Sequence, residues 1–138
     1  MIYERILMDK NDENAYLDCY VADKKENYTR KAILIIPGGG YGMVSDREGE
    51  PIAMAFMPYG YNAFVLNYSC KKFPFPTHLI QASKAMKHIK DNAEEYGIDA
   101  ENVFVVGFSA GGHLAGSLAT MWNNEEIYKE IDMPFGLL

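Results

Sequence analysis

Residues 103–112 read Val-Phe-Val-Val-Gly-Phe-Ser-Ala-Gly-Gly, and they are the most informative segment of the chain. An apolar, β-branched run ends in the pattern G-x-S-x-G, formed by Gly107, Ser109 and Gly111, and a helix-compatible segment follows. In a strand–turn–helix unit this pattern exposes a serine hydroxyl at the tip of a sheet. Glycine is needed at both flanks, because a side chain there would collide with the neighbouring strand or helix. We therefore predict a sharp turn with Ser109 as a candidate nucleophile. The alternative interpretation is an ordinary tight turn between a strand and a helix.

A second glycine-rich segment lies upstream, at residues 37–42, which read Pro-Gly-Gly-Gly-Tyr-Gly. It follows the continuous apolar run 31–36, which is typical of a buried parallel strand. Consecutive glycines let backbone N–H groups point into a cavity, and acyl transfer needs such donors where an oxyanion develops. We assign that role to the amides of Gly39, Gly40 and Ala110. A phosphate-binding loop and a flexible loop are the alternatives, but neither common phosphate-loop pattern fits residues 38–45.

The rest of the chain alternates between strand-like and helix-like patterns. An antiparallel edge pair is expected at residues 3–8 and 15–22, where apolar and polar side chains alternate. Further strands are expected at 31–36, 62–68 and 103–108, helices at 48–57, 77–96 and 110–122, a turn at 99–102, and no clear element at 123–138. This order predicts an α/β fold: an antiparallel N-terminal hairpin, then three parallel strands, in a mostly parallel sheet with flanking helices. Both glycine motifs follow strand ends, so they are expected to meet at one edge.

Composition narrows the functional classes. The 138 residues suggest one domain, and the net charge of −6 argues against nucleic-acid binding. The N-terminal residues do not resemble a signal peptide, and no apolar run approaches the ~20 residues that span a bilayer, so we expect no membrane contact and a cytoplasmic location. Cys19 and Cys70 form no metal or redox motif and fit a reducing compartment. We expect no cofactor and no metal, since no cluster of ligating residues is evident.

Several segments together resemble the α/β-hydrolase superfamily, and more narrowly its acetyl-esterase, xylan-esterase and hormone-sensitive-lipase-like branches. The matching segments are residues 37–41, 47–53, 60–68 and 107–115. Pro37 stands where related lipases often carry histidine, which changes the entry to the loop but not its donors. The resemblance implies a serine esterase that acts on small or carbohydrate esters through an acyl-enzyme at Ser109. Tyr41, Phe73 and Phe75 are candidates for lining the acyl or sugar site, with a packing role as the equal alternative.

The resemblance covers only the N-terminal half of such a domain. In the family the triad runs in the order Ser, Asp or Glu, His. After Ser109 the one histidine is His113, a single helical turn further on, where we expect it to pack or to hydrogen-bond. His78 and His88 are expected to be helix-packing residues, and the acidic residues of 125–132 to be a solvated face. We therefore predict that the triad Asp and His are absent from this chain.

Two further expectations follow from the incomplete set of catalytic residues. Residues 1–138 would be a single, partial domain: a fragment, a truncated product or one half of a split protein. With the later strands absent, the 103–108 strand becomes a sheet edge, and an exposed apolar edge is a template for pairing with another chain. The alternative to an esterase is therefore a catalytically incomplete interaction module that forms a homodimer through this strand. A nucleotide binder that uses the glycine loop is a third, less favoured class.

Overall fold

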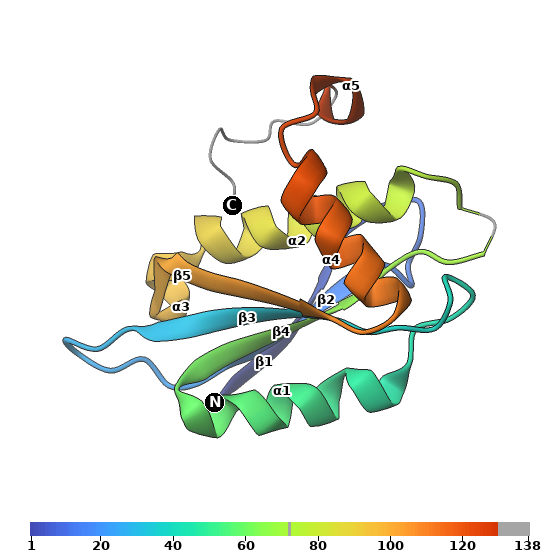
Figure 1. The fold of residues 1–138 in the computed structure, drawn as a ribbon. Coiled ribbons are helices and arrows are strands. Elements are labelled where there is room, and N and C mark those ends of the chain that lie inside the picture. Colours follow the sequence, from blue (N-terminus) through green and yellow to red (C-terminus); the bar gives the residue numbers. More distant parts are fainter. Residues whose placement is uncertain (72, 130–138) are drawn as a thin grey trace.

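The computed structural model describes residues 1–71 and 73–129. Within them, one open sheet is formed by β1 (Ile2–Leu7), β2 (Tyr16–Val21), β3 (Arg30–Ile36), β4 (Tyr61–Asn67) and β5 (Ile98–Gly107). The strand order is β1-β2-β4-β3-β5 (Figure 1). β2 is antiparallel to both neighbours, whereas β4, β3 and β5 run parallel. The predicted hairpin followed by three parallel strands is confirmed, in a sheet that is mixed.

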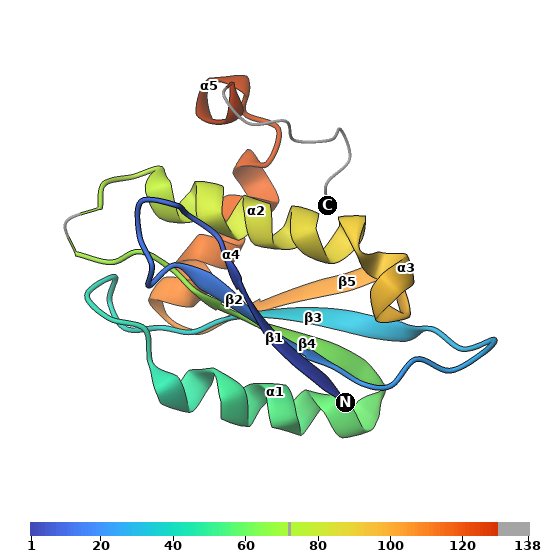
Figure 2. The same cartoon turned by 180° about the vertical axis from the view of Figure 1, so that it is seen from behind.

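Helices cover both faces of the sheet. On one face lies α1 (Glu50–Phe56), flanked by single 3₁₀ turns at Asp46–Glu48 and Met57–Tyr59. On the other lie α2 (Thr77–Asp91), α3 (Ala93–Tyr96) and α4 (Ala110–Met121), with α5 (Glu125–Tyr128) beyond α4 (Figures 1 and 2). Among the described residues, no helix has the length and apolar character needed to cross a membrane.

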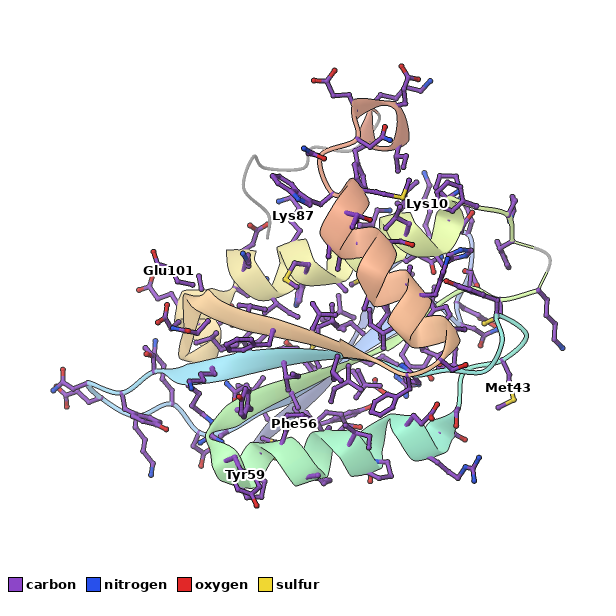
Figure 3. All side chains as sticks on the ribbon, in the orientation of Figure 1. Lys10, Met43, Phe56, Tyr59, Lys87 and Glu101 are labelled. Atoms are coloured by element: carbon purple, nitrogen blue, oxygen red, sulfur yellow. The ribbon has the colours of Figure 1, made fainter. Side chains whose placement is uncertain are left out.

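The core has two layers because the central strands are buried on both sides. In β3, Ala32, Leu34 and Ile36 face α2 and α4, whereas Ile33 and Ile35 face α1. This explains the unbroken apolar run at this strand, since a parallel strand between two helical layers has no solvated face. In the thinner layer, Phe56 of α1 packs onto the sheet, while Tyr59 is 83% exposed (Figure 3).

Helix packing places the turn that carries Ser109. α2 buries the side chains of Leu79, Ala82, Met86 and Ile89, which recur at three- and four-residue steps. α4 buries Leu114 and Leu118, one turn apart, in the same cluster. The start of α4 is therefore fixed where β5 ends.

Two element boundaries differ from the predictions. The 77–96 helix breaks at Asn92, whose side-chain amide donates to the carbonyl of His88 at 2.8 Å and ends α2. The expected turn at 99–102 lies inside β5, which begins at Ile98. There Asp99 accepts the Glu101 amide at 2.9 Å, and the register with β3 shifts between Arg30 and Ala32. The predicted turn is therefore wrong: these residues belong to the strand, which carries an irregularity in its register with β3.

The remaining differences are smaller. The 48–57 helix begins two residues later as α1, after a 3₁₀ turn. The short α5 falls in the segment for which no element was expected, and Asn124 caps it by accepting the Glu126 amide at 3.1 Å. Residues 130–138, which belong to the same prediction, lie outside the described residues.

Candidate active site

Ser109 occupies a strained turn between β5 and α4. Its backbone has φ 53° and ψ −118°, a conformation that costs a non-glycine residue about 1–3 kcal/mol, and the residue is exposed. A Cβ added to Gly107 would lie 2.2 Å from the Gly111 carbonyl oxygen. One added to Gly111 would lie 2.0 Å from the Ile36 carbonyl oxygen. The predicted steric reason for both glycines is confirmed: the first clears the helix and the second clears the end of β3.

The glycine loop and the Ser109 turn meet at one edge of the sheet, as predicted. The Phe108 amide donates to the Ile36 carbonyl at 3.1 Å, which continues the β3–β5 pairing to the turn itself. A Cβ on Gly38 would lie 3.2 Å from the Ser109 Cβ and 2.5 Å from the Phe108 carbonyl oxygen. Gly38 is therefore glycine because the loop passes directly against the turn.

The loop is fixed by hydrogen bonds from three sides. The buried Tyr68 hydroxyl donates to the Pro37 carbonyl at 2.6 Å. The Gly38 amide donates to the Glu48 carboxylate at 3.0 Å, and the Gly38 carbonyl accepts the Ser45 amide at 2.9 Å. Sequence reasoning gave Glu48 and Tyr68 no role, although both lie in segments that resemble the family. Sequence spacing and periodicity do not indicate that a side chain from a distant segment forms a hydrogen bond with this loop.

The backbone amides of Gly39, Gly40 and Ala110 differ from that of Gly38 in their hydrogen bonding. Within the described part of the chain, no hydrogen bond is found for any of these three N–H groups. Gly39 and Gly40 have φ values of 141° and 65°, which turn the loop in a way that L side chains rarely adopt. The carbonyl of Gly39 accepts the amides of Gly42 and Met43, so the loop turns back on itself at this point.

Tyr41 links the loop to the helices behind it. Its hydroxyl and Nδ1 of His113 form a hydrogen bond of 2.7 Å, and its carbonyl accepts the Lys71 amide at 2.7 Å. Its ring stacks against His78, with the centroids 4.6 Å apart. Burial raises the pKa of the Tyr41 hydroxyl and lowers that of His78, so both side chains are neutral at pH 7.

His113 therefore has the hydrogen-bonding role that the sequence suggested. Among residues 1–71 and 73–129, no hydrogen bond joins a histidine ring to the Ser109 hydroxyl. Of the proposed lining residues, Tyr41 is half-buried. Phe73 lines a cavity with Met43 and Tyr68, whereas Phe75 is 55% exposed and stands 6.3 Å from the His78 ring.

One cluster of ligating residues was missed by sequence reasoning. Glu4, Cys19 and His88, from β1, β2 and α2, bring their ligating atoms within 4.8 Å of one another, so the expectation that no such cluster exists is wrong. The Tyr96 hydroxyl lies among them, donating to Glu4 at 2.5 Å and hydrogen-bonding His88 Nε2 at 2.8 Å. Burial raises the pKa of the Cys19 thiol to about 12, which disfavours the thiolate that a metal requires. We interpret the cluster as a hydrogen-bond network around Tyr96.

A mixed α/β sheet with a glycine loop and a strained serine turn at one edge defines an α/β-hydrolase fold. The fold is shared with solved enzymes of that class. An α/β-hydrolase enzyme from a Medee basin deep-sea metagenome library superimposes with a TM-score of 0.83 at 46% identity, over 87% of this chain and 51% of that one. A carboxylesterase from Lactobacillus plantarum gives 0.82 at 26% identity, over 94% and 50%.

Within this class the chain belongs to the BD-FAE family, whose model matches residues 17–135. An endo-1,4-beta-xylanase B of Butyrivibrio fibrisolvens is 42% identical over 103 residues, which are 72% of this chain and 16% of that protein. An acetylxylan esterase of Xylanibacter ruminicola is 31% identical over 112 residues, 80% and 23% respectively. The chain thus spans about half of the solved structures and less than a quarter of these two relatives.

Proposed function

We propose that the protein is a carboxylic-ester hydrolase in which Ser109 is the nucleophile. The observation that carries the proposal is the strained, exposed Ser109 beside a loop whose amides at Gly39 and Gly40 have no hydrogen-bond acceptor among the described residues. The amides of Gly39, Gly40 and Ala110 are proposed as the oxyanion donors. An acetyl or carbohydrate ester is the proposed substrate class, since one relative is named an acetylxylan esterase.

The chemistry needs a base that the described residues do not place at Ser109. In the proposed reaction the Ser109 hydroxyl oxygen attacks the ester carbonyl, and a general base takes its proton. The carbonyl oxygen becomes an oxyanion held by the free amides, and the base returns the proton to the leaving alcohol as the acyl-enzyme forms. Water then attacks the acyl-enzyme, which releases the acid and restores the Ser109 hydroxyl. We expect the base and its acidic partner from outside residues 1–138, since His113 is held by Tyr41.

A fluorophosphonate probe tests the proposal directly. The probe forms a covalent bond only with an activated serine, so we expect one adduct on Ser109 in the catalytically complete protein, detected by peptide mass spectrometry. Ser109→Ala abolishes the adduct, and Ser117→Ala, which changes a serine further along α4, leaves it unchanged. The proposal is contradicted if Ser109 stays unlabelled in folded samples both of this chain and of any longer protein that contains it.

A second candidate function is favoured by the open edge of β5. In the described part of the chain, β5 pairs only with β3, and Phe104 on this edge strand is 45% exposed. An unpaired, partly apolar strand is a template for strand addition. Residues 103–108 of two copies would then pair about a two-fold axis, which makes the chain an interaction module.

Light scattering coupled to size exclusion distinguishes this alternative. We expect the 138-residue chain to form a dimer that Phe104→Lys converts to a monomer, since a lysine on an edge strand opposes pairing. Tyr59→Lys is the matched control, because Tyr59 is an exposed aromatic residue on the 3₁₀ turn after α1. A wild-type chain that is monomeric at every concentration rules out the dimer.

A further inference from the structure

The backbone is strained along three successive residues of the glycine loop. Gly39, Gly40 and Tyr41 have φ values of 141°, 65° and 61°, all in the positive range that L side chains rarely adopt. Glycine takes such values readily, whereas a residue with a bulky side chain takes them at a cost in free energy. A conformation of this kind persists only where surrounding contacts hold it in place. The contacts of Tyr41 therefore show what fixes the course of the loop.

Tyr41 is held at its backbone, at its ring and at its hydroxyl. The Tyr41 carbonyl accepts the amide of Lys71, a second non-glycine residue with positive φ, at 2.7 Å. The ring packs against His78, with the centroids 4.6 Å apart, and edge-on against Tyr68, with the centroids 6.0 Å apart. The hydroxyl forms the 2.7 Å hydrogen bond with His113 Nδ1. Among the described residues, this last hydrogen bond is the one found between the glycine loop and α4.

His113 has a fixed place relative to the Ser109 turn. Its amide donates to the Ser109 carbonyl at 3.0 Å in the first turn of α4, and it follows Ala110 by three residues. Residues at this spacing are neighbours on a helix surface, so helix geometry holds the imidazole beside the turn. The Tyr41–His113 hydrogen bond therefore joins the glycine loop to the segment that carries Ser109 and Ala110.

This hydrogen bond spans the two parts of the proposed oxyanion site. The amides of Gly39 and Gly40 come from the loop, whereas the amide of Ala110 comes from the start of α4. Donors of such a site must lie about 2.7–3.1 Å from one developing oxyanion. A displacement of about 1 Å can lower a rate by about 10²-fold. The spacing between loop and helix must therefore be held closely, and the Tyr41–His113 bond is the link that crosses it.

The exposure of the bond argues against a role in stability alone. His113 is exposed and Tyr41 is half-buried, so water competes with the hydrogen bond and its net contribution to folding is small. The same bond nevertheless ties a strained loop to the helix that begins at the Ser109 turn. Its place in the fold suits a contact that fixes a position.

We infer that Tyr41 and His113 are positioning residues, whose hydrogen bond holds the glycine loop against the start of α4. The pair acts through the amides of Gly39 and Gly40, by keeping them beside that of Ala110. The ordering of the loop stands on the contacts described above, whereas its effect on a reaction rests on the proposed function.

The order of the loop is measurable on the 138-residue chain without any catalysis. Tyr41→Phe removes the hydroxyl and keeps the ring. In nuclear magnetic resonance relaxation we expect backbone order parameters of about 0.85 for residues 39–43 in the wild type and below about 0.6 in Tyr41→Phe, with other residues unchanged. Wild-type order of residues 39–43 in Tyr41→Phe overturns the inference.

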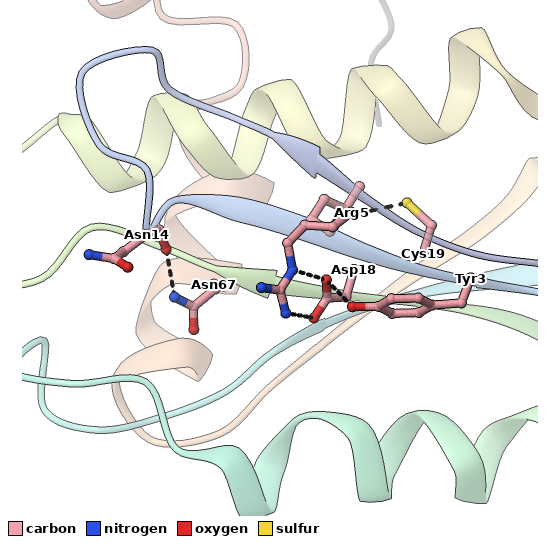
Figure 4. Close-up of polar contacts among 7 residues, drawn as sticks. Tyr3, Arg5, Asn14, Asp18, Cys19 and Asn67 are labelled. Carbon is pink, nitrogen blue, oxygen red and sulfur yellow. Dashed lines mark hydrogen bonds and ion pairs between the residues drawn. The ribbon is translucent and has the colours of Figure 1, made fainter.

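Tyr3→Phe is the matched control for Tyr41→Phe. The Tyr3 hydroxyl also donates in a hydrogen bond, to Asp18 at 2.9 Å (Figure 4). It lies on β1, at the opposite edge of the sheet from β5. Removing this hydroxyl is therefore expected to leave the order of residues 39–43 unchanged.

Catalysis supplies a second readout, in a preparation whose Ser109 reacts with the fluorophosphonate probe. An oxyanion develops only in the transition state, so misplaced donors lower kcat and leave KM unchanged. For p-nitrophenyl acetate we expect Tyr41→Phe to lower kcat at least about tenfold with KM within about twofold of the wild type, and Tyr3→Phe to change neither. Equal kcat values in Tyr41→Phe and Tyr3→Phe also overturn the inference.

Variants of His113 test the other side of the bond. Asparagine carries an amide oxygen and nitrogen at the branch where histidine carries Nδ1, so His113→Asn is expected to keep the order of the loop and most of kcat. His113→Leu is expected to lose both, as Tyr41→Phe does. The double variant Tyr41→Phe/His113→Leu should lose no more than either single variant, because both remove the same bond. Equal losses in His113→Asn and His113→Leu, or additive losses in the double variant, contradict the inference. If His113→Leu does not fold, Tyr41→Phe decides.

The two proposals fail separately. An unlabelled Ser109 in all folded forms contradicts the esterase proposal, while the order of residues 39–43 in Tyr41→Phe still decides whether the bond holds the loop. A labelled Ser109 together with wild-type order and kcat in Tyr41→Phe supports the esterase proposal and contradicts the role of the pair.

Discussion

Replacing Gly111 with alanine is expected to destabilise the fold by about 3 kcal/mol or more, the largest stability effect we expect from a single methyl group in this chain. The added Cβ would lie 2.0 Å from the Ile36 carbonyl oxygen and 2.4 Å from that of Pro37. Both are backbone atoms at the end of the central strand, so neither moves without breaking the sheet. Overpacking against fixed atoms costs about 1–3 kcal/mol and occasionally more.

Gly116→Ala is the matched control for Gly111→Ala. Gly116 lies in the same helix, and among the described residues no atom outside its own helical turn lies within 4 Å of a Cβ added there. Because alanine is the better helix former, this variant is expected to be about 0.5–1 kcal/mol more stable than the wild type. Urea unfolding followed by circular dichroism measures both. Equal stability of Gly111→Ala and the wild type would mean that α4 does not pack against the end of β3 as described.

Features that depend on local pattern were predictable from the sequence. The apolar run at 31–36 is typical of a strand buried on both faces, as β3 is, and the apolar run before Ser109 also predicted a strand, which is β5 at the sheet edge. Glycines at 107 and 111 indicate a close approach, and the structure places a backbone oxygen within 2.2 Å of each added Cβ. The meeting of the two glycine motifs followed from the rule that parallel strands end at the same edge.

Features that depend on distant partners were not predictable. Glu48 and Tyr68 reach the glycine loop from segments whose own pattern gives only a helix start and a strand end. The Glu4, Cys19 and His88 cluster arises from three elements far apart in the sequence, and Tyr96 joins it from a fourth. Asn92 ends a helix whose apolar periodicity continues past it, because its side chain competes for the backbone carbonyl.

Gly39→Ala is expected to lower the catalytic rate by about 10²–10³-fold, the loss typical of removing one oxyanion donor. A Cβ at this position would lie 2.0 Å from the Met43 carbonyl oxygen, and the φ of 141° is accessible to few residues other than glycine. The loop must therefore shift and take its free amides away from Ser109. The measurement is kcat/KM for p-nitrophenyl acetate, in a preparation whose Ser109 reacts with the fluorophosphonate probe.

Gly40→Ala distinguishes a lost donor from general damage to the loop. Gly40 has φ 65°, a left-handed conformation that alanine adopts at a cost of about 1–2 kcal/mol. Apart from its chain neighbours, no atom of the described residues lies within 4 Å of its added Cβ. Its amide stays in place, so we expect the rate to change by only a few-fold. An equal loss in both variants would point to loop strain rather than to the position of the amides. The collision with the Met43 carbonyl must displace the Gly39 amide in the Gly39→Ala variant. A wild-type rate in that variant would therefore show that the Gly39 amide is not an oxyanion donor.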